Sequence, residues 1–136
     1  MKVLYYKIWA DAIATCKSNP LLTSDWKIMA LLGISIPLAL NLMFSMAIFQ
    51  RNIINYSFYH LNLNIFNSKF LDTTIESLTL FLLPPVLLNY FLMYYNKKYL
   101  MVIEKYTSVS KNYFQYYFII VTFMPLSILI IALIFR

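Results

Sequence analysis

Within the apolar stretches of this chain, the side chains most capable of chemistry are those of two asparagines. Each asparagine lies four residues after a proline. Pro37 precedes Asn41, and Pro85 precedes Asn89. A proline inside a helix leaves the carbonyl one turn earlier without its backbone donor. An asparagine amide carries donors and an acceptor that must find partners away from water. We therefore expect these asparagines to bond to each other or to carbonyls freed by prolines. The alternative is that they line a cavity or pore.

The titratable groups that could support catalysis lie outside the apolar stretches. All five acidic residues do so, as does His60, the single histidine. Asp72 and Glu76 are one helical turn apart and could act as acid and base, but such a pair is more often a solvated helix start. One histidine without neighbouring cysteines and with few carboxylates is a poor metal site. The sequence therefore predicts no catalytic, metal-binding or cofactor-binding residue, and a protein that is not an enzyme.

The composition indicates an integral membrane protein. Of the 136 residues, 62% are hydrophobic and 12% are charged, whereas about 25% are charged in a typical soluble domain. Gly33 is the single glycine, which excludes a glycine-rich phosphate loop, and the single cysteine, Cys16, excludes an internal disulfide. The net charge of +6 comes from lysines and arginines beside the apolar stretches. Such residues act as membrane anchors, so no nucleic-acid partner is expected.

Three long apolar stretches predict an all-α membrane protein with three transmembrane helices. About 20 apolar residues in a helix cross the hydrocarbon core of a bilayer. Prolines are expected to kink these helices: they are Pro37 in the first, Pro84 and Pro85 in the second, and Pro125 in the third. The chain is thus expected to form one membrane domain. Its parts are helices over residues 28–50, 74–106 and 111–135, with an external loop over residues 51–73.

The second helix is expected to extend beyond the membrane. A capping-box pattern indicates its start, with Thr73 as the cap and Glu76 three residues later. After the apolar part, helical spacing continues through a charged segment. We therefore expect one long helix over residues 74–106 whose last third lies in the cytoplasm. The alternative is a break at Asn96.

The first 19 residues have helical periodicity, but they are too few and too charged to cross a bilayer. Polar residues form a narrow stripe along this segment, made up of Lys7, Asp11, Thr15 and Ser18. We expect residues 1–19 to form an amphipathic helix in the membrane interface, with Tyr5, Tyr6 and Trp9 at headgroup depth. The alternative is a cytosolic helix docked on a partner subunit.

Small and polar residues recur every four positions in the first apolar stretch. This stripe consists of Gly33, Pro37, Asn41 and Ser45. Small residues let membrane helices approach closely, so the stripe is expected to serve helix packing. Together with Pro84, Pro85, Asn89 and Pro125, these are the candidate helix-packing or cavity residues.

Three helices without an internal charge are few for a self-contained transporter. We therefore interpret the chain as a non-enzymatic accessory or assembly subunit of a larger inner-membrane complex. Its expected partners are other integral membrane subunits and membrane lipid. The alternative is a small homo-oligomeric channel, transporter or lipid-handling protein. Its pore would be lined by Asn41, Asn89, Ser45, Thr79 and Ser127.

The distribution of lysine and arginine predicts the orientation. Eight of these residues precede the first apolar stretch or follow the second: Lys2, Lys7, Lys17, Lys27, Lys97, Lys98, Lys105 and Lys111. The other side carries Arg51, Lys69 and Arg136. The positive-inside rule places the more basic side in the cytoplasm. The sequence thus predicts a multi-pass inner (plasma) membrane protein with a cytoplasmic amino terminus and an external carboxyl terminus.

Overall fold

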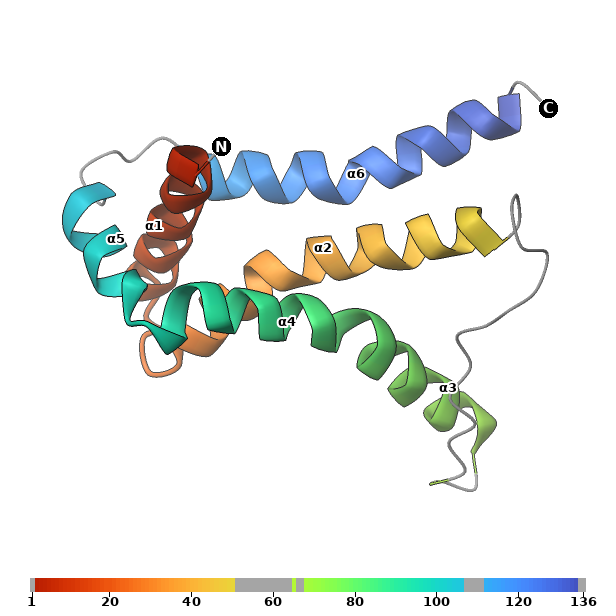
Figure 1. Ribbon diagram of the computed structural model, residues 1–136, viewed down its shortest axis with the longest axis horizontal. Coiled ribbons are helices and arrows are strands. Elements are labelled where there is room, and N and C mark those ends of the chain that lie inside the picture. Colours follow the sequence, from red (N-terminus) through yellow and green to blue (C-terminus); the bar gives the residue numbers. More distant parts are fainter. Residues whose placement is uncertain (1, 51–64, 66–67, 107–111, 135–136) are drawn as a thin grey trace.

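A computed structural model describes residues 2–50, 65, 68–106 and 112–134, and the regular secondary structure of these residues is entirely helical. Long helices run side by side along the molecule (Figure 1). At one end of them lie two shorter helices, α1 (Lys2–Ser18) and α5 (Lys98–Tyr106). The expected all-α architecture is therefore confirmed for this part of the chain.

The central element is α2 (Trp26–Phe49). On one side it packs against α6 (Tyr113–Ile134), and on the other against α4 (Leu83–Tyr90) and the turn before it (Figure 1). Within the described ranges, α4 and α6 do not contact each other. The long helices therefore form a layer with α2 in the middle, and α2 is the element on which the other two depend.

Among the residues that the structure describes, two helical segments are long and apolar enough to cross a membrane. They are α2 and the continuous run Lys69–Tyr95. This run consists of α3 (Lys69–Ser77), the π-helical turn η2 (Leu78–Leu82), α4 and the π-helical turn η3 (Phe91–Tyr95). The turn η2 ends at Leu82, two residues before Pro84. Pro84 and Pro85 lack the N–H groups that regular α-helical bonding would require.

The expected single helix over residues 74–106 is wrong at both ends. The run begins at Lys69, and Thr73 lies inside it, where its hydroxyl donates to the Lys69 carbonyl at 2.8 Å instead of capping a helix. The run ends at Tyr95, because Lys97 adopts a left-handed conformation with φ of 50°. The alternative of a break at Asn96 is the correct one, and α5 is a separate helix.

The expected external loop over residues 51–73 is largely outside the described part of the chain. Residues 51–64 and 66–67 lie outside the described residues, and His60 is among them. Residues 69–73 are the first residues of α3. The other helices agree with expectation to within two residues at each end. They were expected over residues 1–19, 28–50 and 111–135, and they are found over 2–18, 26–49 and 113–134.

The buried core lies at the α1 end of the molecule. It consists of Trp9, Ala10, Ala12, Ile13 and Cys16 of α1, Ala30 and Ile34 of α2, Met93 of η3 and Val102 of α5. Figure 1 shows α1 lying across the ends of the long helices. Trp9 is 0% exposed, and its ring packs edge-on against Tyr94 at a centroid distance of 5.7 Å. Trp9 therefore fills a core and does not belong to an exposed interfacial face.

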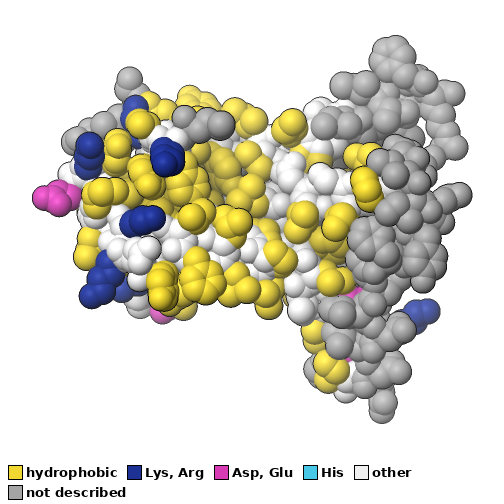
Figure 2. All heavy atoms as spheres, in the orientation of Figure 1, with side chains coloured by type: hydrophobic (Ala, Val, Ile, Leu, Met, Phe, Trp, Pro, Cys, Tyr) yellow, Lys and Arg dark blue, Asp and Glu magenta, His cyan; other side chains and the backbone are white. Residues whose placement is uncertain are grey.

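Charge and apolar surface are separated along the molecule (Figure 2). Lysine side chains gather at the end formed by α1 and α5, whereas the visible face over the long helices is mostly apolar. Exposed residues on these helices include Leu88 at 56%, Phe91 at 54% and Ile120 at 63%. A large exposed apolar surface of this kind is typical of a protein that faces lipid or a partner.

Candidate functional site

Asn89 is at the centre of a polar connection between three helices. Its side chain is 0% exposed. The Asn89 Oδ1 atom accepts a hydrogen bond from the Tyr5 hydroxyl at 2.9 Å, and Asn89 Nδ2 donates to Ser35 Oγ at 3.0 Å. The amide thus joins α4 to α1 and α2, with its donor and acceptor ends both in use. A buried polar group satisfied in this way fixes helix register.

Asn41 forms a second polar connection, between α2 and α6. Its Nδ2 atom donates to two carbonyl oxygens, that of Pro37 at 2.8 Å and that of Val121 at 2.6 Å. The Val121 carbonyl lies one turn before Pro125, whose nitrogen has no hydrogen to donate to it. Asn41 therefore donates to the α6 backbone the hydrogen bond that the nitrogen of Pro125 cannot donate.

The two asparagines are not bonded to each other. Asn41 does bond to a carbonyl that a proline has freed, which was the other expectation. The carbonyl is that of Val121, and the proline, Pro125, lies on another helix. The two amides also serve different helix contacts, so they do not converge on one cavity in the described chain. The other residues of the alternative pore, Ser45, Thr79 and Ser127, are exposed.

The stripe of small residues on α2 faces α6 over part of its length. A Cβ atom added at Gly33 would meet Phe114 Cζ of α6 at 2.9 Å, closer than normal van der Waals contact. Pro37 is buried, and Asn41 reaches the α6 backbone. Ser45, the last member of the stripe, is exposed. The close approach of α2 and α6 therefore depends on Gly33 and Asn41.

The start of α6 is capped from α1. Asp11 Oδ2 accepts a hydrogen bond from the Phe114 backbone N–H at 2.9 Å. A carboxylate is favourable there, because the first N–H groups of a helix lack internal partners and carry partial positive charge. Lys7, one turn earlier on α1, places Nζ 5.4 Å from the centre of the Tyr113 ring. Sequence reasoning missed this contact.

Tyrosine hydroxyls tie the outer helices to the backbone of α2. Tyr117 of α6 donates to the Ile34 carbonyl at 2.8 Å, and Tyr94 of η3 donates to the Lys27 carbonyl at 2.9 Å. These two hydroxyls therefore have a direct role in helix packing.

Burial raises the pKa of two groups on α1. One is the Tyr5 phenol, whose protonated hydroxyl donates to Asn89. Burial also raises the pKa of the Cys16 thiol, which is only 5% exposed. The thiolate is the reactive form of cysteine, so Cys16 has the properties of a core residue and not of a nucleophile.

Asp72 does not occupy the solvated position that was expected for it. Its carboxylate is buried, and Oδ1 accepts a hydrogen bond from the Ile65 backbone N–H at 3.1 Å. It therefore holds the chain that precedes α3 against that helix. Among the residues described, no group of three histidine, cysteine, aspartate or glutamate side chains is placed to hold a metal ion.

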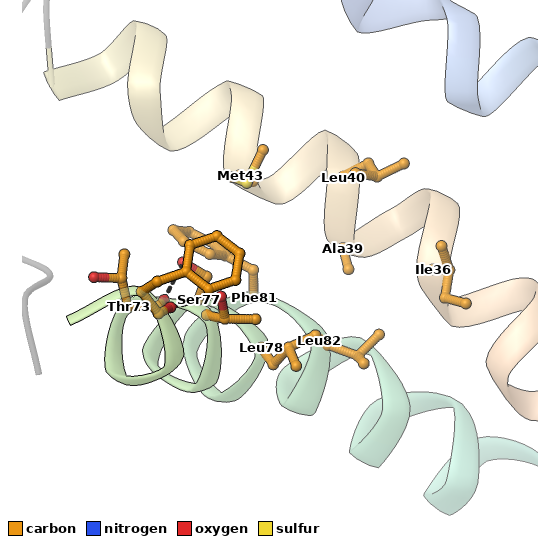
Figure 3. Close-up of a pocket in the computed structure, with 11 residues that line it drawn as sticks. Ile36, Ala39, Leu40, Met43, Thr73, Ser77, Leu78, Phe81 and Leu82 are labelled. Atoms are coloured by element: carbon orange, nitrogen blue, oxygen red, sulfur yellow. Dashed lines mark hydrogen bonds between the residues drawn. The ribbon is translucent and has the colours of Figure 1, made fainter. Parts of the chain in front are cut away.

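A groove separates α2 from the α3–η2 segment (Figure 3). Its volume is about 520 Å³. In Figure 3, Ala39, Leu40 and Met43 of α2 lie opposite residues of α3 and η2. The lining from α3 and η2 consists of Phe70, Thr73, Thr74, Ser77, Leu78, Phe81 and Leu82. The hydroxyls of Thr73, Thr74 and Ser77 donate to carbonyls of their own helix, so the groove presents a nearly apolar surface.

Comparison of the chain with protein-family models, with curated proteins and with solved structures finds no match.

Proposed function

We propose that this chain is a non-enzymatic accessory or assembly subunit of a larger complex in the inner membrane. The observation that carries the proposal is the groove between α2 and α3–η2, which a transmembrane helix of a partner would fill (Figure 3). In this proposal α2, the run Lys69–Tyr95 and α6 each cross the membrane, with kinks at their prolines. The lysine-rich end with α1 is cytoplasmic and interfacial, and the far end of α6 is external.

The chemistry of the groove favours a helix as its occupant. Ala39, Thr74 and Ser77 are small, and small residues allow the backbones of two membrane helices to approach closely. Because the hydroxyls are bonded to their own helix, a partner does not need polar groups to match them. Leu40, Met43 and Phe81 provide the large apolar surface against which such a helix would pack.

The internal polar groups support an assembly role over transport. A solute pathway needs polar groups that face a common space. Asn41 and Asn89 instead form hydrogen bonds within the chain, and Asn89 is fully buried. Thr79 and Ser127 donate to carbonyls of their own helices. Asn41 and Asn89 therefore stabilise the helix arrangement.

The groove can be tested by photo-crosslinking in native membranes. A photoreactive amino acid at Met43, inside the groove, is expected to crosslink to a different membrane protein. The same amino acid at Ile120, exposed on α6, is the control position and is expected to give no adduct with that protein. An adduct only with lipid, or only with a second copy of this chain, would contradict the proposal.

A pair of matched substitutions links the crosslinked partner to the groove. Thr74→Phe fills the groove, whereas Thr79→Phe adds the same side chain outside it. Both threonines are exposed, and both donate to a carbonyl four residues earlier. Thr74→Phe is expected to abolish co-purification of the partner in mild detergent, and Thr79→Phe to preserve it. Equal retention in both variants would exclude the groove as the binding surface.

A further inference from the structure

A second cleft, at the basic end of the molecule, combines positive charge with apolar surface. It lies between the start of α2 and the junction of η3 with α5, and its volume is about 380 Å³. Lys27 and Lys97 line it from opposite elements, and both side chains are exposed. None of the described residues that line it is acidic. The cleft therefore attracts an anion.

The two lysines are available to a ligand. Lys27 Nζ lies 5.4 Å from the centre of the Tyr99 ring and 5.7 Å from that of Trp26. Neither lysine is paired with a carboxylate among the residues described. Lys97 is held in position by its left-handed backbone, with its N–H bonded to the Tyr94 carbonyl at 3.0 Å. An anion placed between the lysines would thus meet two ammonium groups without competition from a carboxylate of the described residues.

The rest of the lining is suited to the apolar part of an amphipathic ligand. Ile28 and Leu31 lie further along α2, on the side of the membrane-spanning segment, and Tyr90 contributes an exposed ring. Tyr94 and Tyr99 form the aromatic wall, with ring centroids 5.3 Å apart. Tyrosines of this kind are typical of headgroup depth, where one end of a ring is apolar and the other is hydrated.

We propose that this cleft binds one anionic phospholipid. The phosphate lies between Lys27 and Lys97, and an acyl chain follows Ile28 and Leu31 along α2. A free phosphate ion would use the lysines but leave the aliphatic part of the cleft unfilled, whereas a phospholipid matches both parts. This inference rests on the membrane placement proposed above and is independent of any partner protein.

The test is lipid retention, measured by native mass spectrometry. The protein is reconstituted in nanodiscs of equal phosphatidylglycerol and phosphatidylcholine, transferred to mild detergent, and the retained lipids are counted. The unchanged protein is expected to retain one phosphatidylglycerol in preference to phosphatidylcholine. The double variant Lys27→Gln/Lys97→Gln is expected to lower this retention about tenfold or more, since each lysine near a phosphate contributes separately.

Two further variants separate a built site from general charge. Lys2→Gln/Lys105→Gln removes the same charge from exposed positions outside the cleft and is expected to retain the lipid. Lys27→Arg/Lys97→Arg, which keeps the charge, is also expected to retain it. Equal losses in both glutamine variants, or equal retention of phosphatidylcholine, would overturn the proposal. Displacement of the lipid by millimolar inorganic phosphate would overturn it in favour of a soluble anion.

Discussion

Asn41 and Thr122 are two polar side chains with opposite expected contributions to stability. Asn41 donates to the carbonyls of Pro37 and Val121. The Thr122 hydroxyl is buried without a hydrogen-bond partner in the described structure. Removing a hydrogen-bonded side chain leaves its buried partner without a hydrogen bond, which lowers stability. Replacing an unbonded hydroxyl by a methyl group removes only the cost of desolvating that hydroxyl.

Substitution of each side chain by an apolar one tests this difference in stability. Asn41→Leu is expected to lower the free energy of unfolding by about 1–2 kcal/mol, because the Val121 carbonyl loses its donor. Thr122→Val, which is nearly isosteric, is expected to be neutral or slightly stabilising. Reversible unfolding in mixed micelles of a mild detergent and dodecyl sulfate measures both. A larger loss for Thr122→Val than for Asn41→Leu would show that the polar connection is wrongly assigned.

At the scale of elements, α1 organises the basic end by packing its core and capping another helix. Asp11 accepts the Phe114 N–H at the start of α6. Asp25 is the residue before α2, but its side chain makes no capping hydrogen bond. Both carboxylates lie near a helix start, but only that of Asp11 accepts a hydrogen bond from a helix N–H. The Asp25 carboxylate instead accepts one from the Ser24 hydroxyl at 3.0 Å.

Alanine substitution of each aspartate tests whether the bond to the α6 N–H contributes to stability. Asp11→Ala is expected to lower the free energy of unfolding by about 1 kcal/mol, the typical cost of losing a helix cap. Asp25→Ala, which removes the same charge, is expected to cost clearly less. The same micelle titration measures both variants. Equal effects would mean that charge alone, and not the bond to α6, accounts for the contribution of Asp11.

The helices were predictable from local pattern to different degrees. The ends of α1, α2 and α6 follow from apolar runs flanked by polar residues, which local periodicity detects. The start of α3 was missed because Lys69, Asp72 and Thr73 have a loop-like composition. The break at Asn96 was left open, since Lys97 gives no sequence signal for a left-handed conformation.

The partners of the candidate site residues were less accessible to sequence reasoning. The spacing of Asn41 and Asn89 from prolines indicated buried amides that need partners. It could not indicate Val121 or Tyr5, which lie 80 and 84 residues away. The Asp11–Phe114 bond spans 103 residues, and no local pattern links the two positions. Such pairs depend on how whole helices pack, which is a property of the tertiary structure.

In the proposed topology, the whole molecule crosses the membrane three times and has its lysine-rich end in the cytoplasm. The native thiol is a poor reporter of this arrangement, because Cys16 is buried and burial raises its pKa. Exposed positions at the two ends are better. Leu21, at 87% exposed, and Asn96 lie at the basic end, and Ile65, at 62% exposed, lies between the first two proposed crossings.

The most direct test is thiol labelling of sealed right-side-out membrane vesicles with a membrane-impermeant maleimide. Single cysteines are placed by Leu21→Cys, Asn96→Cys or Ile65→Cys, or appended after Arg136, in a Cys16→Ala background. Ile65→Cys and the appended cysteine are expected to react in intact vesicles, and Leu21→Cys and Asn96→Cys only after permeabilisation. Protection of the appended cysteine in intact vesicles, or labelling of Leu21→Cys there, would contradict the three-crossing arrangement.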